Sequence, residues 1–418
     1  MAGRAVDTLF RKPKLIVCLV TVLGLTAYIS TLTVSSIFDN QSERMGKTSE
    51  LRTLNQWQQR RNQYILEHKH GGFIDLKGSI RVPIKFLENY KNPCWRDVVP
   101  NNSVSKLVCL PYFFLLGVMK SGTWDIFSSL TLHPDIEIRS KEPLWIARCH
   151  FNCTQKNYYA NYCSGKYQWT FQSYLNYFGE STTKIDMTKS KKKNGEFYHP
   201  KITADCSPDT FFDWTWSQNR NIPQYDELPY HNNPELLFMM NPKAKMIVSI
   251  RNPTYRLYSG YWQSKPKNPS PEDFHQRVIE SIAKFNKCTE TRELIDCAVD
   301  DKLEYEARKF GVRVFVGIYY IYFLEWFRVF PREQFFIIKF EKYTEDRAKV
   351  MANVFDFLDL APLNGTSLIS TMNKAKPQRK TAKGSMLDST KQILDNFYRP
   401  YNEKLSELLG SDDYSWAE

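Results

Sequence analysis

Three short apolar runs along the chain are each followed by a stretch with helical spacing. The runs are residues 112–118 (YFFLLGV), 244–250 and 334–340. The helical stretches after them are residues 124–132, 254–262 and 344–358. Continuously apolar strands that alternate with helices are typical of a parallel sheet covered on both faces. The pattern therefore predicts an α/β fold with a central parallel sheet flanked by helices.

A longer apolar stretch lies near the N-terminus. Residues 15–38 contain no charged side chain, and at about 1.5 Å per residue they are long enough to cross a bilayer core of roughly 30 Å. Four basic residues and one aspartate precede them, so the positive-inside rule places residues 1–14 in the cytosol. A cleaved signal peptide, the alternative, would have a shorter apolar region and a small-x-small cleavage site. We expect a single-pass type II signal-anchor.

The polar residues 39–92 predict a stem between this anchor and a globular domain at 93–418. A helical patch covers residues 49–68, with a weak apolar stripe. We interpret it mainly as part of a solvated spacer, and the alternative is a short dimerising helix that would give a homodimer through the stem.

The charge of the chain indicates an acidic partner. Its 418 residues carry a formal net charge of +12, which suits nucleic acid, an anionic membrane or an acidic glycan. The anchor places the domain in the secretory lumen, so we expect no nucleic acid. Sequons for N-glycosylation, which a luminal domain could use, begin at Asn40, Asn101, Asn152 and Asn364.

The cysteines agree with an oxidising compartment. Eight remain when Cys18, inside the apolar stretch, is set aside, and an even number allows disulfides. The preferred pairs, because each is close in sequence, are Cys94–Cys109 and Cys288–Cys297. Zinc is the alternative for the three cysteines between residues 149 and 163. No CxxC pair or HExxH motif supports it, so we expect no metal.

The loop after the first strand resembles a phosphate-binding loop. Gly117 and Gly122 have the G-x-x-x-x-G spacing of an ATP-binding loop, which Lys and Ser or Thr should follow. Here Thr123 and Trp124 follow, and Lys120 lies inside the loop. Such a loop offers free N–H groups and the positive end of a helix dipole. It therefore predicts a site for an anion with fewer charges than ATP that needs no magnesium.

A second motif, SIRNPTYRLYSGYW, covers residues 249–262. The strand ends at Arg251, and the next helix carries Arg256 and Ser259. Ligands of α/β folds bind at the carboxyl ends of strands, and Arg with a helical Ser can clamp a phosphate. One such Arg alone could be an ordinary ion-paired residue. Two motifs at two strand ends favour a ligand with two anionic groups.

Together the two motifs resemble the 5′-phosphosulfate and 3′-phosphate binding motifs of the Golgi carbohydrate sulfotransferases. These enzymes use 3′-phosphoadenosine 5′-phosphosulfate (PAPS) as sulfuryl donor. The resemblance extends over about residues 93–418 and includes NPCW, KEPLW and QILDNFYRPYNEKL. It is greatest for the branch that 6-O-sulfates N-acetylgalactosamine 4-sulfate in chondroitin and dermatan chains. It implies a glycosaminoglycan acceptor and a Golgi membrane location.

The resemblance implies a role for each matched donor-site residue. Lys120 would contact the bridging oxygen and the transferring sulfuryl group. The cradle for the 5′-phosphate would consist of Ser121, Gly122, Thr123 and the position of Trp124. The 3′-phosphate would be held by Arg251 and Ser259, and a late basic loop that closes over the nucleotide would supply Lys383 and Gly384.

The resemblance also implies a general base. Glu142, in KEPLW, would take a proton from a sugar hydroxyl as that oxygen attacks sulfur in line, while Lys120 stabilises charge on the leaving phosphate. The alternative for Glu142 is an ion pair with Lys141 or another basic neighbour. Asp205 and Ser207 are expected near the acceptor or the donor, with a structural turn as their alternative.

The sequence departs from the family at two positions of the loop. Trp124 stands where a second Thr or Ser is common, and Met119 where proline is common. A lost charge-assisted contact is worth about 1.5–3 kcal/mol, so we expect weaker donor binding but retained activity. The alternatives are sulfation of heparan sulfate or another glycan, a non-catalytic glycan-binding protein, and a P-loop kinase.

Overall fold

The computed structural model describes residues 58–70, 72–76, 80–98, 105–149, 170–214, 230–363 and 384–417. The predicted tail at 1–14 and anchor at 15–38 lie outside these residues, as do the four sequon asparagines and Lys383. Among the helices that the structure describes, none is both long and apolar enough to span a membrane. The chain divides into two compact units, residues 1–62 and 63–418, and the labelled elements below belong to the second.

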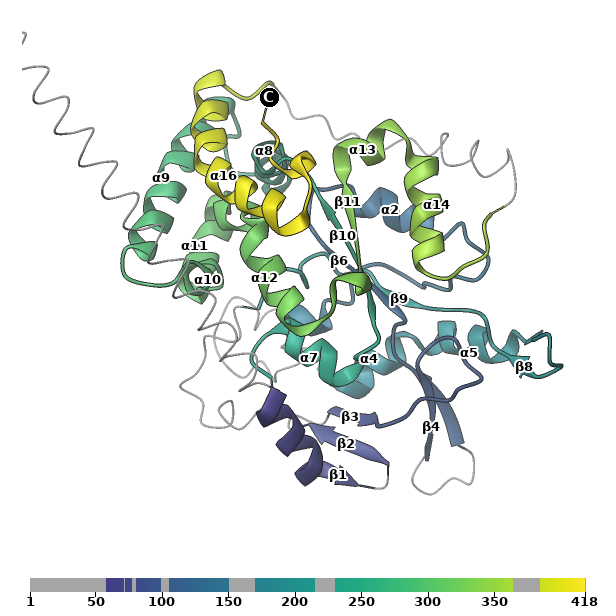
Figure 1. Ribbon diagram of the computed structural model, residues 1–418. Helices are drawn as coiled ribbons and strands as arrows, with labels where there is room; N and C mark the ends of the chain where they lie inside the picture. The colour runs from purple at the N-terminus through teal and green to yellow at the C-terminus, as the bar shows by residue number, and fades with distance from the viewer. Residues whose placement is uncertain are drawn as a thin grey trace, which may run out of the picture. The chain divides into compact units, whose positions relative to one another are not determined.

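A four-stranded parallel sheet forms the centre of this unit (Figure 1). Its order is β11 (Phe335–Lys339), β10 (Lys245–Ile250), β6 (Phe113–Gly117) and β9 (Ala204–Asp205), and each neighbouring pair is parallel. The three predicted strands are confirmed to within one residue at either end. The sequence did not predict β9, because two residues are too short to give an apolar run.

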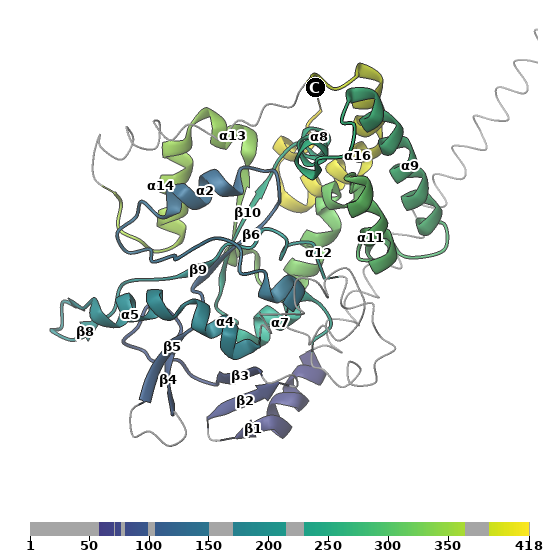
Figure 2. The same ribbon diagram turned by 180° about the vertical axis from the view of Figure 1, so that it is seen from behind.

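Helices cover both faces of the sheet, as predicted. Figures 1 and 2 show α2 (Thr123–Leu130) and α14 (Arg347–Phe357) on one side, with α12 (Tyr319–Val329) and α16 (Asp388–Leu409) on the other. The core on the first side joins strand and helix residues, among them Phe113, Leu115, Ile126, Leu130 and Val354. The α/β class with a central parallel sheet is therefore confirmed.

Capping residues determine where the helices near the site begin. Helix α8 (Pro253–Ser264) starts after Asn252, whose Oδ1 accepts from the backbone N of Thr254 at 3.0 Å. The predicted helix at 344–358 is divided into α13 (Phe340–Glu345) and α14. Asp346 ends the first and caps the second, where its Oδ1 accepts from the N of Lys349 at 3.0 Å. An Asp in this capping role favours a new helix start over a continuous helix.

The described residues form further helices, strands and turns, which run in the following order along the chain. They are β1 (Lys69–His70), β2 (Phe73–Leu76), β3 (Ile80–Pro83), β4 (Cys94–Val98), β5 (Ser105–Cys109), the π-helical turn η1 (Trp145–Cys149), α4 (Phe171–Tyr177), α5 (Gly179–Met187), β7 (Ser190–Lys191), β8 (Phe197–Tyr198), α7 (Asn233–Met240), α9 (Pro271–Thr289), α10 (Leu294–Ala298), α11 (Asp301–Phe310) and the 3₁₀ turns η3 (Val314–Gly317), η4 (Arg332–Gln334) and η5 (Asp412–Tyr414).

Part of the segment predicted as a stem contains strands. β1, β2 and β3 form an antiparallel sheet, and Ile80 and Val82 of β3 are buried. The strands are too short to give a clear alternation in the sequence. Residues 58–68, inside the predicted helical patch, are helical. The boundaries at 14, 38 and 92 stay predictions.

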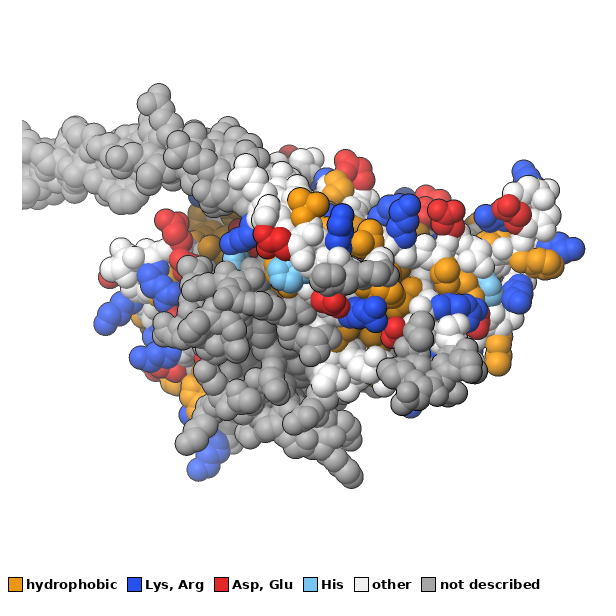
Figure 3. All heavy atoms as spheres, turned by 90° about the horizontal axis from the view of Figure 1, so that it is seen from below, with side chains coloured by type: hydrophobic (Ala, Val, Ile, Leu, Met, Phe, Trp, Pro, Cys, Tyr) orange, Lys and Arg blue, Asp and Glu red, His pale blue; other side chains and the backbone are white. Residues whose placement is uncertain are grey.

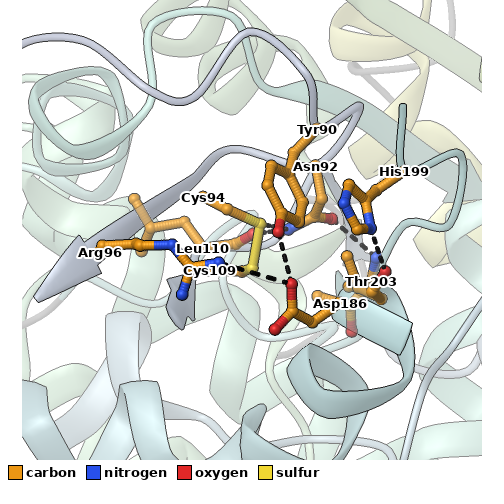
Figure 4. The surroundings of a disulfide bond; sticks show 10 residues. Tyr90, Asn92, Cys94, Arg96, Cys109, Leu110, Asp186, His199 and Thr203 are labelled. Carbon is orange, nitrogen blue, oxygen red and sulfur yellow. Dashed lines mark hydrogen bonds and ion pairs between the residues drawn. A yellow bond between two sulfur atoms is a disulfide. The ribbon is translucent and has the colours of Figure 1, made fainter. Parts of the chain in front are cut away.

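Both preferred disulfides are present. Cys288–Cys297 joins α9 to α10, and Cys94–Cys109 joins the paired strands β4 and β5. Figure 4 shows how the second disulfide lies beside Asn92, whose side chain donates to Leu110 O at 2.6 Å and accepts from Thr203 N at 2.8 Å. Since Thr203 directly precedes β9, this amide ties the disulfide hairpin to the edge of the central sheet.

Candidate active site

The two motifs found in the sequence meet at the carboxyl ends of β6 and β10. Val118 donates its N–H to Ser249 O at 2.6 Å, and the Ser249 hydroxyl donates to Ser121 O at 2.6 Å. Arg251 Nη1 donates to Lys120 O at 3.4 Å. The loop is therefore fixed to the neighbouring strand by backbone and side-chain contacts, which the parallel order of the two strands makes possible.

The loop has the backbone of an anion cradle. Lys120 and Gly122 both have left-handed φ values, 70° and 76°, and Gly122 directly precedes α2. A Cβ on Gly122 would lie 2.5 Å from a ring carbon of Phe340, so only glycine fits there. The Ser121 hydroxyl is fully buried and lacks a hydrogen-bond partner within the described part of the chain. A buried orphan hydroxyl beside a helix N-terminus fits an anionic ligand such as the phosphosulfate of PAPS.

The side chains expected at the donor's two ends lie in one corner of the domain. The stem of Lys120 passes over α8, because its Cγ is 3.9 Å from the position that a Cβ on Gly260 would take. Ser259, half-buried, precedes that glycine. The Arg251 guanidinium lies 5.1 Å from the centre of the Phe340 ring, and burial lowers its pKa. The structure thus brings Lys120 and Arg251 together and places Ser259 on the helix that the Lys120 stem approaches.

The late loop predicted to close over the nucleotide reaches the same helix. Gly384 O accepts a hydrogen bond from the Tyr258 hydroxyl at 3.1 Å, and Tyr258 precedes Ser259 on α8. Gly384 has a φ of 106°, a value that favours glycine. Its neighbour Lys383 lies outside the described residues, so its role stays a prediction.

Glu142 is connected to the cradle by the side chain of Lys141. Lys141 Nζ is 2.6 Å from Glu142 Oε1 and donates to Thr123 Oγ1 at 3.2 Å. Arg139, the other basic neighbour, pairs with Glu180 instead, at 3.5 Å. The ion pair weighed as an alternative for Glu142 is therefore present. The same pair also holds the carboxylate beside the first residue of α2.

Lys141 is the residue at this site whose role the sequence did not indicate. Its side chain is only 5% exposed, and its ammonium group lies 5.4 Å from the centre of the Trp124 ring. Trp124 itself is 54% exposed. The position that lacks the usual hydroxyl therefore supplies a ring face for a buried cation. The only sequence signal was the Lys-Glu pair inside KEPLW.

Replacing Lys141 with methionine is expected to weaken PAPS binding by roughly tenfold to a hundredfold. The variant removes the buried cation that contacts Thr123 of the predicted cradle, and a charge-assisted hydrogen bond is worth about 1.5–3 kcal/mol. Isothermal titration calorimetry with PAPS measures the change in donor affinity. Lys184→Met, which removes a lysine paired with Glu137, is the control. An unchanged donor affinity with a reduced kcat would show that Lys141 only positions Glu142.

Asp205 and Ser207 lie behind this pair, at the end of β9. Asp205 is buried and accepts from the Tyr174 hydroxyl at 2.9 Å. Ser207 Oγ accepts from the backbone N of Leu144 at 2.9 Å. Burial is the main cause that raises the pKa of Asp205 to about 6; the charge of Glu142 adds to the shift, and hydrogen bonds from Ser207 and Tyr174 oppose it. Ser207 thus supports the segment that carries Glu142, and Asp205 joins the end of β9 to α4.

Asp205→Asn is expected to stabilise the protein above pH 6. With a pKa near 6 when folded and about 3.9 when unfolded, native Asp205 keeps a proton that the unfolded chain loses as pH rises between these values. Stability therefore falls through this window, by about 3 kcal/mol in total. Asparagine keeps an oxygen for Tyr174 and removes the penalty.

Urea unfolding at pH 4 and pH 7.5 checks this expectation. The variant should gain stability over the wild type at pH 7.5 and much less at pH 4. An equal difference at both pH values would contradict the assigned titration.

Comparison with known proteins gives the family. The sulfotransferase domain family matches residues 110–397. Human carbohydrate sulfotransferase 15 (Homo sapiens) is 27% identical over 384 residues, covering 80% of this chain and 66% of its own length. Carbohydrate sulfotransferase 15 from Nototodarus sloanii is 38% identical over 140 residues, covering 32% of this chain and 86% of that sequence.

Two further relatives are more distant. Heparan sulfate glucosamine 3-O-sulfotransferase 6 from Mus musculus is 24% identical, with 73% of each chain covered. The crystal structure of a sulfotransferase from Alicyclobacillus acidocaldarius is 20% identical, has a TM-score of 0.48, and covers 72% of this chain and 97% of its own.

The family match includes both motifs and the Lys-Glu pair that the fold brings to one site. The match to human carbohydrate sulfotransferase 15 spans slightly less than two thirds of that protein, and it supports the carbohydrate branch that the motifs indicated. A family of this kind implies PAPS as the donor. The family match over most of the globular unit confirms that the chain belongs to the sulfotransferase family.

Proposed function

We propose that the chain transfers a sulfuryl group from PAPS to a hydroxyl of a glycosaminoglycan, and that its acceptor is the 6-OH of N-acetylgalactosamine 4-sulfate in chondroitin or dermatan sulfate. One observation carries the proposal: Lys141 joins Glu142 to Thr123 at the N-terminus of α2, so a carboxylate base and the anion cradle share one site. The similarity to carbohydrate sulfotransferase 15 supports the choice of branch.

PAPS supplies an activated sulfuryl group bonded to a good leaving phosphate. In the proposed reaction Ser121, Gly122 and Thr123 hold the 5′-phosphosulfate, while Arg251 and Ser259 hold the 3′-phosphate. Glu142 accepts the proton of the sugar hydroxyl as its oxygen bonds to sulfur. The bond between sulfur and the phosphate oxygen breaks, and the products are a sulfate ester and 3′,5′-ADP. Lys120 stabilises the charge that develops on that oxygen.

The proposed location is the Golgi membrane, with the catalytic domain in the lumen. The charge-free residues 15–38 support an anchor, and two disulfides agree with an oxidising compartment. The sequons and a homodimer through the stem belong to the same proposal. Digestion with an N-glycosidase, read as a mobility shift of the full chain, tests the luminal side directly.

The test of the activity is transfer of radiolabel from PAPS by the full chain in detergent. Chondroitin 4-sulfate, dermatan sulfate, desulfated chondroitin and heparan sulfate are offered in parallel. Label recovered in a 4,6-disulfated disaccharide supports both the reaction and the acceptor. Label only in heparan sulfate keeps the reaction and overturns the acceptor. A folded chain that binds glycans without any transfer would be a glycan-binding protein.

A further inference from the structure

A short hairpin at the end of α5 carries basic and apolar side chains into solvent. We call residues 187–198 the basic hairpin; it contains β7 and β8 and has four lysines against one glutamate. Met187 is 78% and Phe197 56% exposed. The view from below (Figure 3) shows basic and hydrophobic side chains together at the right-hand end, where β8 lies in Figure 1.

The charge of the basic hairpin is only partly compensated. Lys192 pairs with Glu196 at 3.6 Å, and Lys191 Nζ lies 5.3 Å from the centre of the Phe197 ring. Within the ranges that the structure describes, neither Lys189 nor Lys193 has a carboxylate within ion-pair distance. Exposed ammonium groups next to an aromatic ring suit a ligand with anionic groups and apolar ring faces.

The basic hairpin is connected to the candidate active site by a continuous line of contacts. Residues 137–142 run along α4 and α5. From residue 140 back to residue 137, their contact partners lie successively further along α4 and α5, away from Glu142. Tyr177 donates to Ser140 O at 2.9 Å, Arg139 pairs with Glu180 at 3.5 Å, and Lys184 pairs with Glu137 at 3.2 Å. Figures 1 and 2 show α4, α5 and β8 in one row.

The length of this row separates the basic hairpin from the reacting sugar. α5 has nine residues and is therefore about 13 Å long, so the basic hairpin lies more than one sugar away from Glu142. A single sugar bound at Glu142 does not reach the basic hairpin. A polymer bound at Glu142 reaches the hairpin with sugars further along its chain.

We propose that the basic hairpin is a second contact for the acidic glycan chain, outside the active site. The identity of the glycan rests on the proposed function, but the contact itself rests on exposed charge and on its line of contacts with Glu142. Tethering one end of a polymer raises the effective concentration of its other sugars at the site. The basic hairpin therefore lowers KM for long chains and leaves kcat and short acceptors unchanged.

The test replaces Lys189, Lys191 and Lys193 together with glutamine. A matched control replaces three exposed lysines elsewhere in the chain, Lys85, Lys302 and Lys404, with glutamine. The full chain and both variants are assayed with polymeric chondroitin 4-sulfate and with its tetrasaccharide. We expect KM for the polymer to rise roughly five- to tenfold in the hairpin variant, with the tetrasaccharide kinetics unchanged and the control like wild type.

Two results would overturn the proposal. One is an unchanged KM for the polymer in the hairpin variant. The other is an equal rise of KM for polymer and tetrasaccharide, which would place the effect inside the active site. Binding to vesicles containing phosphatidylserine is measured in parallel. If that binding is lost while KM for the polymer is unchanged, the hairpin contacts a membrane instead.

The proposed function and the hairpin contact can fail separately. Turnover of the tetrasaccharide by the wild type reports the reaction alone. If no acceptor is sulfated, equilibrium binding of fluorescent polymer at 50 and 200 mM salt still compares the variants. Tighter binding by the wild type, most evident at low salt, supports the hairpin contact, and equal binding by all three proteins refutes it.

Discussion

Lys120→Met is expected to lower kcat for sulfuryl transfer by about 10²–10³-fold, the cost of removing a group that stabilises charge in a transition state. The lysine is held for this task at three points: its left-handed backbone, its carbonyl at Arg251 and its stem over Gly260. A cation fixed in advance needs no reorganisation when the phosphate leaves.

Single-turnover assays with saturating PAPS measure this effect apart from donor binding. Lys120→Arg keeps the charge and changes its shape, so it separates charge from position. We expect the arginine variant to recover only part of the rate, because a planar guanidinium differs from a compact ammonium group. A methionine variant with a normal single-turnover rate would remove Lys120 from the proposed mechanism.

Glu142→Gln is expected to lower the transfer rate by about 10²–10⁴-fold, the usual contribution of a positioned general base. Glutamine has nearly the same shape but cannot accept the proton. Because the proposed donor contacts are made by the loop and Arg251, the affinity for PAPS should change far less than the rate. Loss of kcat with retained PAPS binding is therefore the expected signature.

The matched control for this variant is Glu180→Gln. Glu180 also pairs with a basic residue, Arg139, but on α5 and away from the cradle. That variant should keep full activity. If Glu142→Gln keeps it too, Glu142 acts only as the partner of Lys141, which is the structural alternative that the ion pair at 2.6 Å leaves in place.

The parts of the site that lie in local motifs could be predicted from the sequence. The loop, Arg251 and the three long strands are read from consecutive residues, and the parallel order then brings them together. Lys141 could not be assigned in this way. Its burial depends on Trp124 and Thr123, which are distant in sequence and meet it only in the fold.

The same limit applies to the edge of the sheet. β9 has two residues, and its partner is chosen by pairing with β6 rather than by any pattern of its own. The hydrogen bond from Tyr174 on α4 to Asp205 on β9 could not be predicted from the sequence either. Short strands and long-range hydrogen bonds carry too little local signal to be predicted.

The ring of Phe340 has a consequence for how this enzyme can diverge. It lies against Gly122 and also near the guanidinium of Arg251, so one aromatic side chain spaces the two anion-binding groups. A side chain at position 122 would need a smaller residue at position 340 and would still be strained by the left-handed φ of 76°. A smaller residue at position 340 would also remove the ring that Arg251 lies against. The same ring therefore couples these three positions in the fold, although Gly122 and Phe340 lie more than two hundred residues apart in the sequence.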